Sequence, residues 1–373
     1  MTPGMRRLWW HAPCWPMGVM EHRAFERDDT PERDDTPVHW GRYELWDVLG
    51  RGGAATVVRA LAPPSADRPE VVALKFLHRS LVDDPKAAAA FRAEAALGML
   101  LRHPNIVRTY DLEHHDGRSA IVMEYVDGRP LHTFHHPALF PAPEHEPYMV
   151  AALIAQTCDA LHALHTVRGA DGSARRVVHR DVTPQNILVR RDGVVKLLDY
   201  GVFFSPDRGF HTTAGFLKGK VPYLAPEYID SRPWDHRVDV WAAGVIAWEF
   251  LTGKRLFRGE SPGRTMVAVR RALIPDPSSL RPELSPRLAA VVMRALERNI
   301  ARRYRSAHEF AVALREVIGA EYGVVDPETL SDWADGREPR AASGVMRVAR
   351  SLSPPGESAE RDTLSFHSKL TGT

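Results

Sequence analysis

The sequence predicts an α+β fold built of two lobes, a small first lobe rich in strands with one main helix and a larger, mostly helical second lobe. Two patterns indicate this. Residues 42–125 contain short apolar runs separated by turn residues, whereas the segments after Gly128 have helical spacing. With 373 residues the chain is also longer than one small domain requires. Two such lobes leave a cleft between them, where we expect the chemistry.

The first lobe begins with strand-like segments. An apolar run starts at Tyr43 and leads into a Gly-rich turn, Val57 and Val58 follow that turn, and a third run covers residues 71–77. Short apolar runs bounded by turn residues are typical of β-strands. The pattern therefore predicts a twisted antiparallel sheet.

One helix and two more strands are expected in the same lobe. A stretch dense in Ala and Leu predicts a helix over 86–101, which ends before Pro104. Strands are predicted over 106–110 and 120–125, on either side of a turn at 115–117.

The second lobe is predicted to be mainly helical, because its apolar residues recur at helical spacing. The clearest expected helices cover residues 148–165, 238–251, 287–298 and 307–318.

Changes in texture along the chain predict three parts. Residues 1–38 lack periodic apolar pattern and are expected to be a disordered leader. The folded domain is expected over 39–322, with the lobes at 39–126 and 127–322. Residues 323–373 are rich in Pro, Ser, Gly and charge, and we expect a flexible tail.

Composition excludes several classes of protein. Lys and Arg number 49 against 47 Asp and Glu, so no excess of positive charge marks a binder of nucleic acid or of anionic membranes. Only Cys14 and Cys158 occur, which fits a reducing compartment. The longest apolar stretch, 240–250, contains Glu249 and is shorter than the roughly 18 residues of a membrane span. We therefore expect a cytoplasmic protein.

The Gly-rich turn is the first candidate for chemistry. Gly50, Gly52 and Gly53 lie between two predicted strands, where glycine lets backbone N–H groups approach phosphate oxygens. An ordinary hairpin turn explains this segment equally well. Lys75 lies in an apolar strand and needs a partner for its charge, which Glu94 in the following helix can supply.

Two further motifs decide between these interpretations. The segment 179–186 reads His-Arg-Asp-Val-Thr-Pro-Gln-Asn, and residues 199–201 read Asp-Tyr-Gly. Together with the Gly-rich turn, Lys75 and Glu94, they resemble, in the same chain order, the signatures of eukaryotic-like protein kinases. The chain is most similar to bacterial serine/threonine kinases of this type, over residues 40–322.

The resemblance implies a role for each polar residue of these motifs. Lys75 holds the α- and β-phosphates of ATP, and Glu94 orients the Lys75 ammonium. Asp181 accepts the proton of the attacking hydroxyl. Asn186 and Asp199 supply oxygen ligands to magnesium, a hard cation.

The resemblance also implies a nucleotide site. Backbone of the Gly-rich turn covers the triphosphate, apolar side chains of both lobes enclose the adenine, and backbone of the connection between the lobes meets its polar edge. The implied cofactors are ATP and Mg²⁺. The implied nucleotide-binding residues are Gly50, Gly52, Gly53, Val57, Ala73, Lys75, Met123, Glu124, Val126 and Leu188.

Three later segments extend the resemblance. Ala225-Pro226-Glu227 matches the end of the activation segment, Asp239 opens the central helix of the second lobe, and Arg303 stands where the family has the partner of that Glu. This platform favours an extended protein substrate over a small molecule.

The sequence departs from the family pattern at four positions. Ala55 replaces the third glycine, and Tyr200 replaces Phe in the Asp-Phe-Gly triplet. Thr183 stands where serine/threonine kinases have Lys, and Lys220 follows Gly219 where they have Thr. Lys and Thr are thus exchanged, and we expect Lys220 to reach Asp181 and serve as a catalytic residue. A solvent-facing Lys220 is the alternative.

These observations predict an ATP- and magnesium-dependent kinase for Ser/Thr hydroxyls of protein substrates, autophosphorylating and acting in bacterial signalling. A pseudokinase scaffold is the alternative, and tyrosine specificity stays open because of Thr183. Thr212 and Thr213 are the expected activating phosphorylation sites, beside Arg180.

The leader adds a candidate interaction. Thr30 and Thr36 stand in identical Arg-Asp-Asp-Thr-Pro contexts, and Thr363 partly repeats them. Such threonines are candidate docking sites for a phosphothreonine-binding partner. A solvated tail with a chance duplication is the alternative.

Overall fold

The computed structural model describes residues 38–134, 146–200, 219–271 and 273–335. By its internal contacts the chain separates into Met1–Val38 and His39–Thr373, and the fold below is that of the second unit. The predictions for the leader, for Thr212 and Thr213, and for the chain after residue 335 lie outside the described residues.

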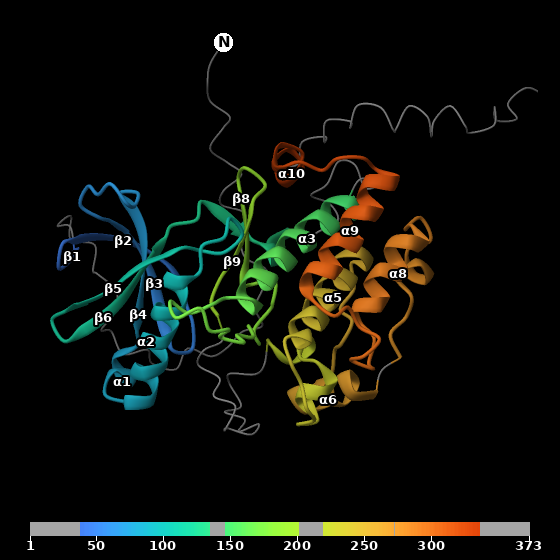
Figure 1. Cartoon of the computed structure of the whole chain (residues 1–373), viewed down its shortest axis with the longest axis horizontal. Helices are drawn as coiled ribbons and strands as arrows, with labels where there is room; N and C mark the ends of the chain where they lie inside the picture. Colours follow the sequence, from blue (N-terminus) through green and yellow to red (C-terminus); the bar gives the residue numbers. More distant parts are fainter. Residues whose placement is uncertain (1–37, 135–145, 201–218, 272, 336–373) are drawn as a thin grey trace, which may run out of the picture. The chain divides into compact units, whose positions relative to one another are not determined.

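A six-stranded sheet forms the first lobe (Figure 1). Its order is β1-β2-β3-β4-β6-β5, and the pairs β2–β3, β3–β4, β4–β6 and β5–β6 are antiparallel, as the sequence predicts. The strands are β1 (Val38–Trp40), β2 (Tyr43–Arg51), β3 (Ala55–Leu61), β4 (Val71–Leu77), β5 (Thr109–His115) and β6 (Arg118–Glu124).

Strand β5 differs from its predicted position at 106–110. Asp116 and Gly117 both have positive φ, 46° and 71°, which is the geometry of a tight hairpin turn. His115 therefore pairs directly with Arg118, and the strands flank the turn without a gap. Ile106 instead forms an isolated bridge with Leu197.

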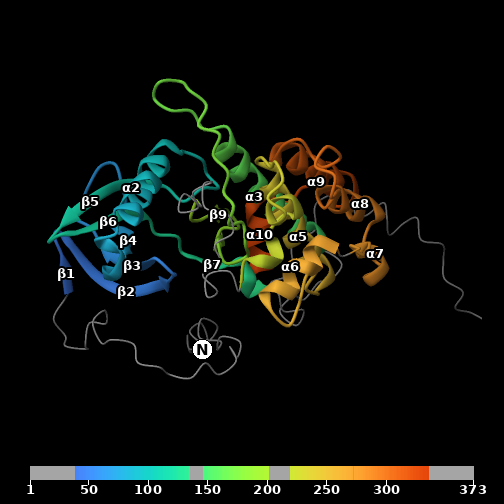
Figure 2. The ribbon, with the colours of Figure 1, turned by 90° about the horizontal axis from the view of Figure 1, so that it is seen from below.

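Helix α2 (Pro85–Leu100) is the main helix of the first lobe and agrees with the predicted one. Asp84 caps it, because its carboxylate accepts a hydrogen bond from Lys86 N at 2.8 Å. The buried residues Phe91 and Ala95 pack against β4 and β6 in a small core. Figure 2 shows α2 lying against this sheet. A short helix, α1 (Arg79–Val82), precedes it.

A second, three-stranded sheet and a set of helices form the rest of the fold. The antiparallel strands β7 (Gly128–Pro130), β8 (Ile187–Arg190) and β9 (Val195–Leu197) join the two lobes. The helices are η1 (Leu131–Phe134), α3 (Glu146–His165), η3 (Val221–Tyr223), α4 (Pro226–Ile229), α5 (Arg237–Thr252), α6 (Pro262–Arg271), α7 (Pro277–Leu280), α8 (Pro286–Ala295) and α9 (Ala307–Glu321).

The main core of the second lobe surrounds α5. Its residues from Val238 to Leu251 are all buried, and α3, α8 and α9 pack around them. An apolar helix without a polar face is expected at the centre of a lobe. The four helices predicted for this lobe are present as α3, α5, α8 and α9, and no end is shifted by more than three residues.

The predicted flexible tail is wrong for one segment. Residues Pro327–Ala334 form helix α10, and Leu330 and Trp333 are buried in the main core. The Trp333 ring stacks on Phe134 with centroids 5.9 Å apart. Two large apolar side chains one turn apart release enough surface from water to hold a short helix against the lobe.

Candidate active site

One face of the first-lobe sheet carries four of the predicted nucleotide-binding side chains. Val57 pairs with Lys75, and Ala73 pairs with Met123. Cross-strand partners lie on the same face of a sheet, and so do residues two apart along one strand. The four side chains therefore line one surface, with the Lys75 ammonium at one side of an apolar patch.

The Gly-rich turn joins β2 to β3. Gly50 pairs with Val57, and Gly52 N donates a hydrogen bond to Ala55 O at 2.8 Å. Ala55 is not among the described residues with positive φ. Alanine in place of the family's third glycine is therefore accommodated without strain.

Glu124 ends β6 and begins the connection to the second lobe. Its carboxylate accepts hydrogen bonds from Lys196 Nζ at 2.8 Å and from Arg108 N at 3.2 Å. Lys196 pairs in register with Leu188, so the two side chains lie on the same face of the second sheet. Leu188 thus faces the same side as Glu124, and Val126 follows in the connecting segment.

Lys75 contacts two carboxylates. Its Nζ lies 2.6 Å from Glu94 Oε1 and 2.6 Å from Asp199 Oδ1. Burial alone would lower the pKa of Lys75, but the Asp199 and Glu94 carboxylates raise it above its ordinary value. Burial raises the pKa of Glu94 from 4.5 to about 7, although Lys75 acts in the opposite direction. The lysine is therefore a fixed positive charge.

Asp199 follows β9 with φ at +49°, a left-handed conformation that Asp tolerates better than most residues. Its side chain is 47% exposed, against 8% for Lys75. Desolvation opposes the charge of Asp199, but Lys75 holds the pKa of this carboxyl below its usual range. Asp199 is thus an anion that is open to a ligand.

Asp239 holds the loop that contains the His-Arg-Asp motif. This buried carboxylate of α5 accepts hydrogen bonds from His179 N at 2.8 Å and Arg180 N at 2.9 Å, and its Oδ2 lies 2.7 Å from His165 Nε2. Arg180 has φ at +62°, which is unfavourable for a side chain of this size. The charged hydrogen bonds offset that strain.

Asp181 lies next to Asn186 and Lys220. Asn186 Nδ2 donates to Asp181 O at 2.9 Å and to Asp181 Oδ2 at 2.8 Å, and Lys220 Nζ lies 2.6 Å from the same Oδ2. Asp181 Oδ1 accepts no hydrogen bond from any residue that the structure describes. Thr183 is buried in the same loop. The structure thus brings Lys220 to Asp181.

The platform beside this loop is fixed by a buried ion pair. Arg303 Nη1 and Nη2 lie 2.7 and 3.3 Å from the two oxygens of Glu227, a bidentate geometry that fixes α4. A small hollow separates α4, η3 and the Asp181 loop, and Lys220, Thr183 and Tyr228 line it.

This geometry can be compared with known proteins. The family model for the protein kinase domain matches residues 43–312. The chain belongs to the protein kinase family. The kinase domain is 37% identical over 283 residues to the serine/threonine-protein kinase Pkn1 of Myxococcus xanthus, a match that covers 74% of this chain and 38% of that protein.

Other similar proteins carry the same fold. The tyrosine-protein kinase MasK of Myxococcus xanthus is 32% identical over 74% of this chain and 43% of its own length. The crystal structure of the PknI kinase domain of Mycobacterium tuberculosis is 27% identical with a TM-score of 0.54, over 75% of this chain and 97% of that one. The chain spans about two fifths of the length of the curated relatives Pkn1 and MasK.

Within the described residues, no helix is long and apolar enough to cross a membrane. The described part of the chain also lacks any group of three or more His, Cys, Asp or Glu side chains arranged to hold a metal ion. Any metal near Asp199 would therefore need further ligands, such as the Asn186 amide oxygen, phosphate or water.

Two residues of the kinase site have contacts that the sequence does not predict. The sequence places Asp239 only at the start of a helix and assigns no role to His165, whereas the structure joins them beside the His-Arg-Asp loop. Helical spacing placed Asp239 at the start of a central apolar helix, and a lone carboxylate there was the signal of a buried hydrogen-bond acceptor.

Proposed function

We propose that this chain is an ATP- and magnesium-dependent protein kinase that transfers the γ-phosphoryl group of ATP to Ser and Thr hydroxyls of protein substrates. The observation that carries the proposal is Lys75, whose Nζ lies 2.6 Å from both Glu94 and Asp199. That contact joins the two lobes at one point, and phosphoryl transfer depends mainly on such fixed charges.

The nucleotide binds between the lobes. Lys75 neutralises the α- and β-phosphates while Glu94 keeps its ammonium oriented. The Asp199 carboxylate and the Asn186 amide oxygen hold Mg²⁺, which neutralises phosphate charge when bound. These two side chains fit a magnesium site. Asp199 is ionised and half exposed. Asn186 donates a hydrogen bond to Asp181 through Nδ2, so its amide oxygen is the atom that would coordinate the ion.

Asp181 accepts the substrate proton. The hydroxyl oxygen of the substrate attacks the γ-phosphorus, the bond to the bridging oxygen of ADP breaks, and the hydroxyl proton passes to Asp181. Lys220 and Asn186 both contact Asp181 Oδ2, and these contacts fix the orientation of the carboxylate that takes the proton. Lys220 brings a positive charge beside the transferring phosphoryl group, where the loop itself has Thr183.

Radiolabelled ATP tests the proposal directly. We expect phosphate transfer to a protein acceptor, or to the chain itself, that depends on added magnesium and stops on chelation. Lys75→Met and Asp199→Ala each abolish transfer while the protein stays folded, because one removes the phosphate clamp and the other a metal ligand. Substantial transfer by either variant, with contaminating kinases excluded, contradicts the assignment.

A pseudokinase scaffold is the competing function. A scaffold binds partners or nucleotide and transfers nothing. Two sets of contacts favour the enzyme. Lys75 contacts Glu94 and Asp199, and Asn186 contacts Asp181. Nucleotide binding without transfer in the wild-type protein would favour the scaffold.

Residue preference is proposed as Ser and Thr, which follows the similarity to Pkn1. The similarity to the tyrosine-protein kinase MasK makes phosphotyrosine the outcome to look for. Mass spectrometry of the protein after incubation with ATP and magnesium identifies the modified residues and decides between them.

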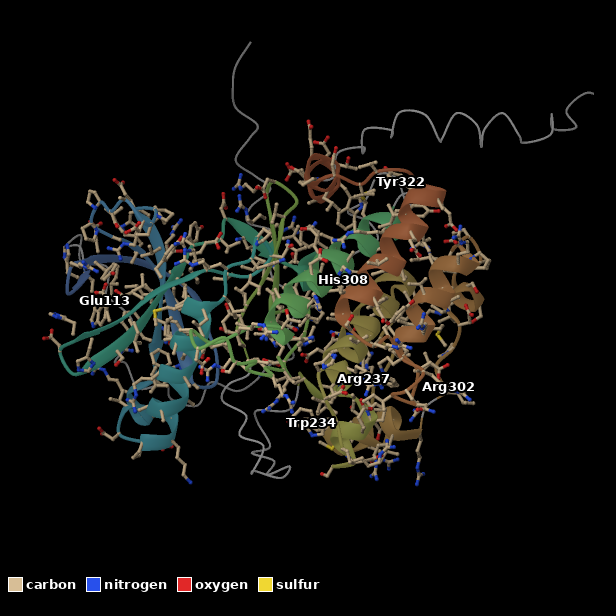
Figure 3. All side chains as sticks on the ribbon, viewed as in Figure 1. Glu113, Trp234, Arg237, Arg302, His308 and Tyr322 are labelled. Carbon is tan, nitrogen blue, oxygen red and sulfur yellow. The ribbon has the colours of Figure 1, made fainter. Side chains whose placement is uncertain are left out.

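Phosphorylation of Thr212 or Thr213 is proposed to activate the enzyme, with Arg180 as the partner of the phosphate. The Arg180 guanidinium lies over the ring of Trp234, 4.9 Å from its centroid (labelled in Figure 3). This stacking holds the cation at the side of the catalytic loop. Normal activity in the Thr212→Ala/Thr213→Ala variant would exclude this regulation.

A role in bacterial signalling is proposed from the same relatives. The threonines of the repeated leader motif are proposed docking sites for a phosphothreonine-binding partner. Removal of residues 1–37 should abolish such an interaction, and an unchanged set of partners and phosphorylation sites would favour a chance duplication.

A further inference from the structure

Tyr200 makes contacts that the family's phenylalanine lacks. Its ring is buried, 6% exposed, and its hydroxyl donates a hydrogen bond to Val107 O at 2.9 Å. Thr109 Oγ1 and Tyr200 Cε2 both lie beside Gly98. Tyr200 directly follows Asp199, so the hydrogen bond to Val107 O fixes the backbone that carries the proposed metal ligand.

Gly98 makes room for this arrangement. It lies in α2, four residues after Glu94, so the two residues occupy the same face of the helix. A Cβ at Gly98 would lie 2.2 Å from Thr109 Oγ1 and 3.4 Å from Tyr200 Cε2. The first distance is impossible for real atoms, so any other residue would displace the Thr109 hydroxyl. The glycine is required by packing, because its φ is not positive.

These contacts connect helix α2 to the second lobe at two places. Glu94 of α2 holds Lys75, and Lys75 holds Asp199. Tyr200, the next residue, packs beside Gly98 of the same helix. The helix is thus held at two points one turn apart, by an ion pair at Glu94 and by close packing at Gly98.

We infer that the Tyr200 hydroxyl and the Gly98 notch form a latch that keeps Asp199 against Lys75 and keeps α2 with Glu94 turned inward. Tyr200 and Gly98 are positioning residues: they act on the nucleotide site through Asp199 and Glu94. The inference rests on the roles proposed above for those two residues. The latch keeps Lys75, Glu94 and Asp199 in contact before the nucleotide binds. The free-energy cost of ordering these side chains is therefore not subtracted from the binding energy.

Tyr200→Phe tests the hydroxyl. Hydrogen exchange of the nucleotide-free protein reports the segment 195–200, where Leu198 N bonds Asn186 O at 2.8 Å. We expect faster exchange there and a KM for ATP raised by about two- to tenfold with a smaller change in kcat, because fewer molecules hold the binding-competent arrangement.

Tyr304→Phe is the matched control. The Tyr304 hydroxyl also donates to a backbone carbonyl, Val291 O at 3.2 Å, and its ring is 2% exposed. This variant should lose a comparable hydrogen bond, with unchanged exchange at 195–200 and an unchanged KM. Equal effects of Tyr304→Phe and Tyr200→Phe would mean a general loss of stability and would overturn the latch.

Gly98→Ala tests the notch, with Gly319→Ala as its control. Gly319 lies inside α9, and a Cβ there meets nothing within 4 Å. Alanine at Gly319 should leave the KM for ATP unchanged and stabilise its helix. Gly98→Ala should accelerate exchange at 195–200 and raise the KM at least tenfold. Wild-type values of both quantities in Gly98→Ala would overturn the inference.

The two proposals fail in different ways. If the wild-type protein transfers no phosphate but Tyr200→Phe and Gly98→Ala still loosen residues 195–200, the kinase function fails and the latch stands. If phosphate is transferred and neither variant changes exchange or KM, the latch fails and the kinase function stands.

Discussion

Glu94 is a buried carboxylate whose charge state should govern the pH dependence of the enzyme. Burial raises its pKa to about 7, so the carboxyl becomes protonated below that pH and no longer holds the Lys75 ammonium. We expect ATP affinity and turnover to fall as the pH is lowered from about 8 to 6. Glu94→Gln should give a low, flat profile, measured as kcat/KM against pH; a wild-type profile in this variant would contradict the assignment.

The stability contribution of Glu94 has the opposite sign. Because its pKa is raised from 4.5 in the folded protein, the folded state binds the proton more tightly than the unfolded chain. The stabilisation from this group is fully present below about pH 4.5 and is lost as the pH rises through about 7. Denaturant titrations of wild type and Glu94→Gln across this range separate the effect from activity.

Lys220 and Thr183 lend themselves to a double-mutant cycle. Lys220→Thr should lower kcat by about ten- to a hundredfold, because it removes a positive charge beside the transferring phosphoryl group. Adding Thr183→Lys should restore part of the loss, since the charge returns to the same place.

Lys254→Thr, a change at an exposed lysine beyond α5, is the control and should leave kcat unchanged. Additive losses in the Lys220→Thr/Thr183→Lys variant would show that the two positions do not exchange roles. Unchanged kcat in Lys220→Thr alone would end the proposal of a catalytic Lys220.

At the scale of elements, helix α10 lies beyond the matched family region, which ends at residue 312. Ser331 Oγ donates a hydrogen bond to Arg191 O at the end of β8, and the chain at Pro327 lies close against Gly193 in the β8–β9 turn. The helix therefore supports the small sheet that carries Leu188 and Lys196. An element outside the family domain thus buttresses the connection between the lobes.

Trp333→Ala should destabilise the protein by about 3–5 kcal/mol, the cost of emptying a large buried site. The side chain is 1% exposed and stacks on Phe134. Trp46→Ala, at a tryptophan that is 41% exposed, should cost much less. Urea unfolding measures both, and equal midpoints for the two variants would mean that α10 contributes little.

At the scale of the whole molecule, buried charges join elements that are distant in the sequence. Lys75 and Asp199 are 124 residues apart, and Glu227 and Arg303 are 76 apart. The Glu227–Arg303 pair is shielded from water on both sides, so loss of one partner leaves a charge without compensation. The nucleotide site and the substrate platform are therefore fixed to the cores by electrostatic contacts.

Arg303→Met should cost about 3–5 kcal/mol in the free energy of unfolding, because it leaves Glu227 buried and unpaired. Adding Glu227→Gln should recover a large part of that cost, since the orphaned charge is removed. Denaturant unfolding of the two single variants and the double variant checks this. Strictly additive losses would mean that the two side chains do not stabilise each other.

Short motifs in a fixed order along the chain were enough to predict the family. Asp181, Asn186 and Asp199 stand in such motifs, and Lys75 and Glu94 were predicted from a charge in an apolar strand and a partner in the next helix. The antiparallel sheet and the main helices were also predictable, since apolar periodicity and turn residues act over a few residues.

Tertiary structure decided what depends on partners distant in the chain. The register of β5 follows from a turn with two left-handed residues, and α10 is ordered by packing of Trp333 on Phe134. Tyr200 looked like a neutral replacement until Gly98, Thr109 and Val107 stood around it. Local pattern identifies the candidate catalytic residues. Burial and hydrogen bonding between remote segments decide how firmly each one is held, because a side chain meets those partners only after the chain has folded.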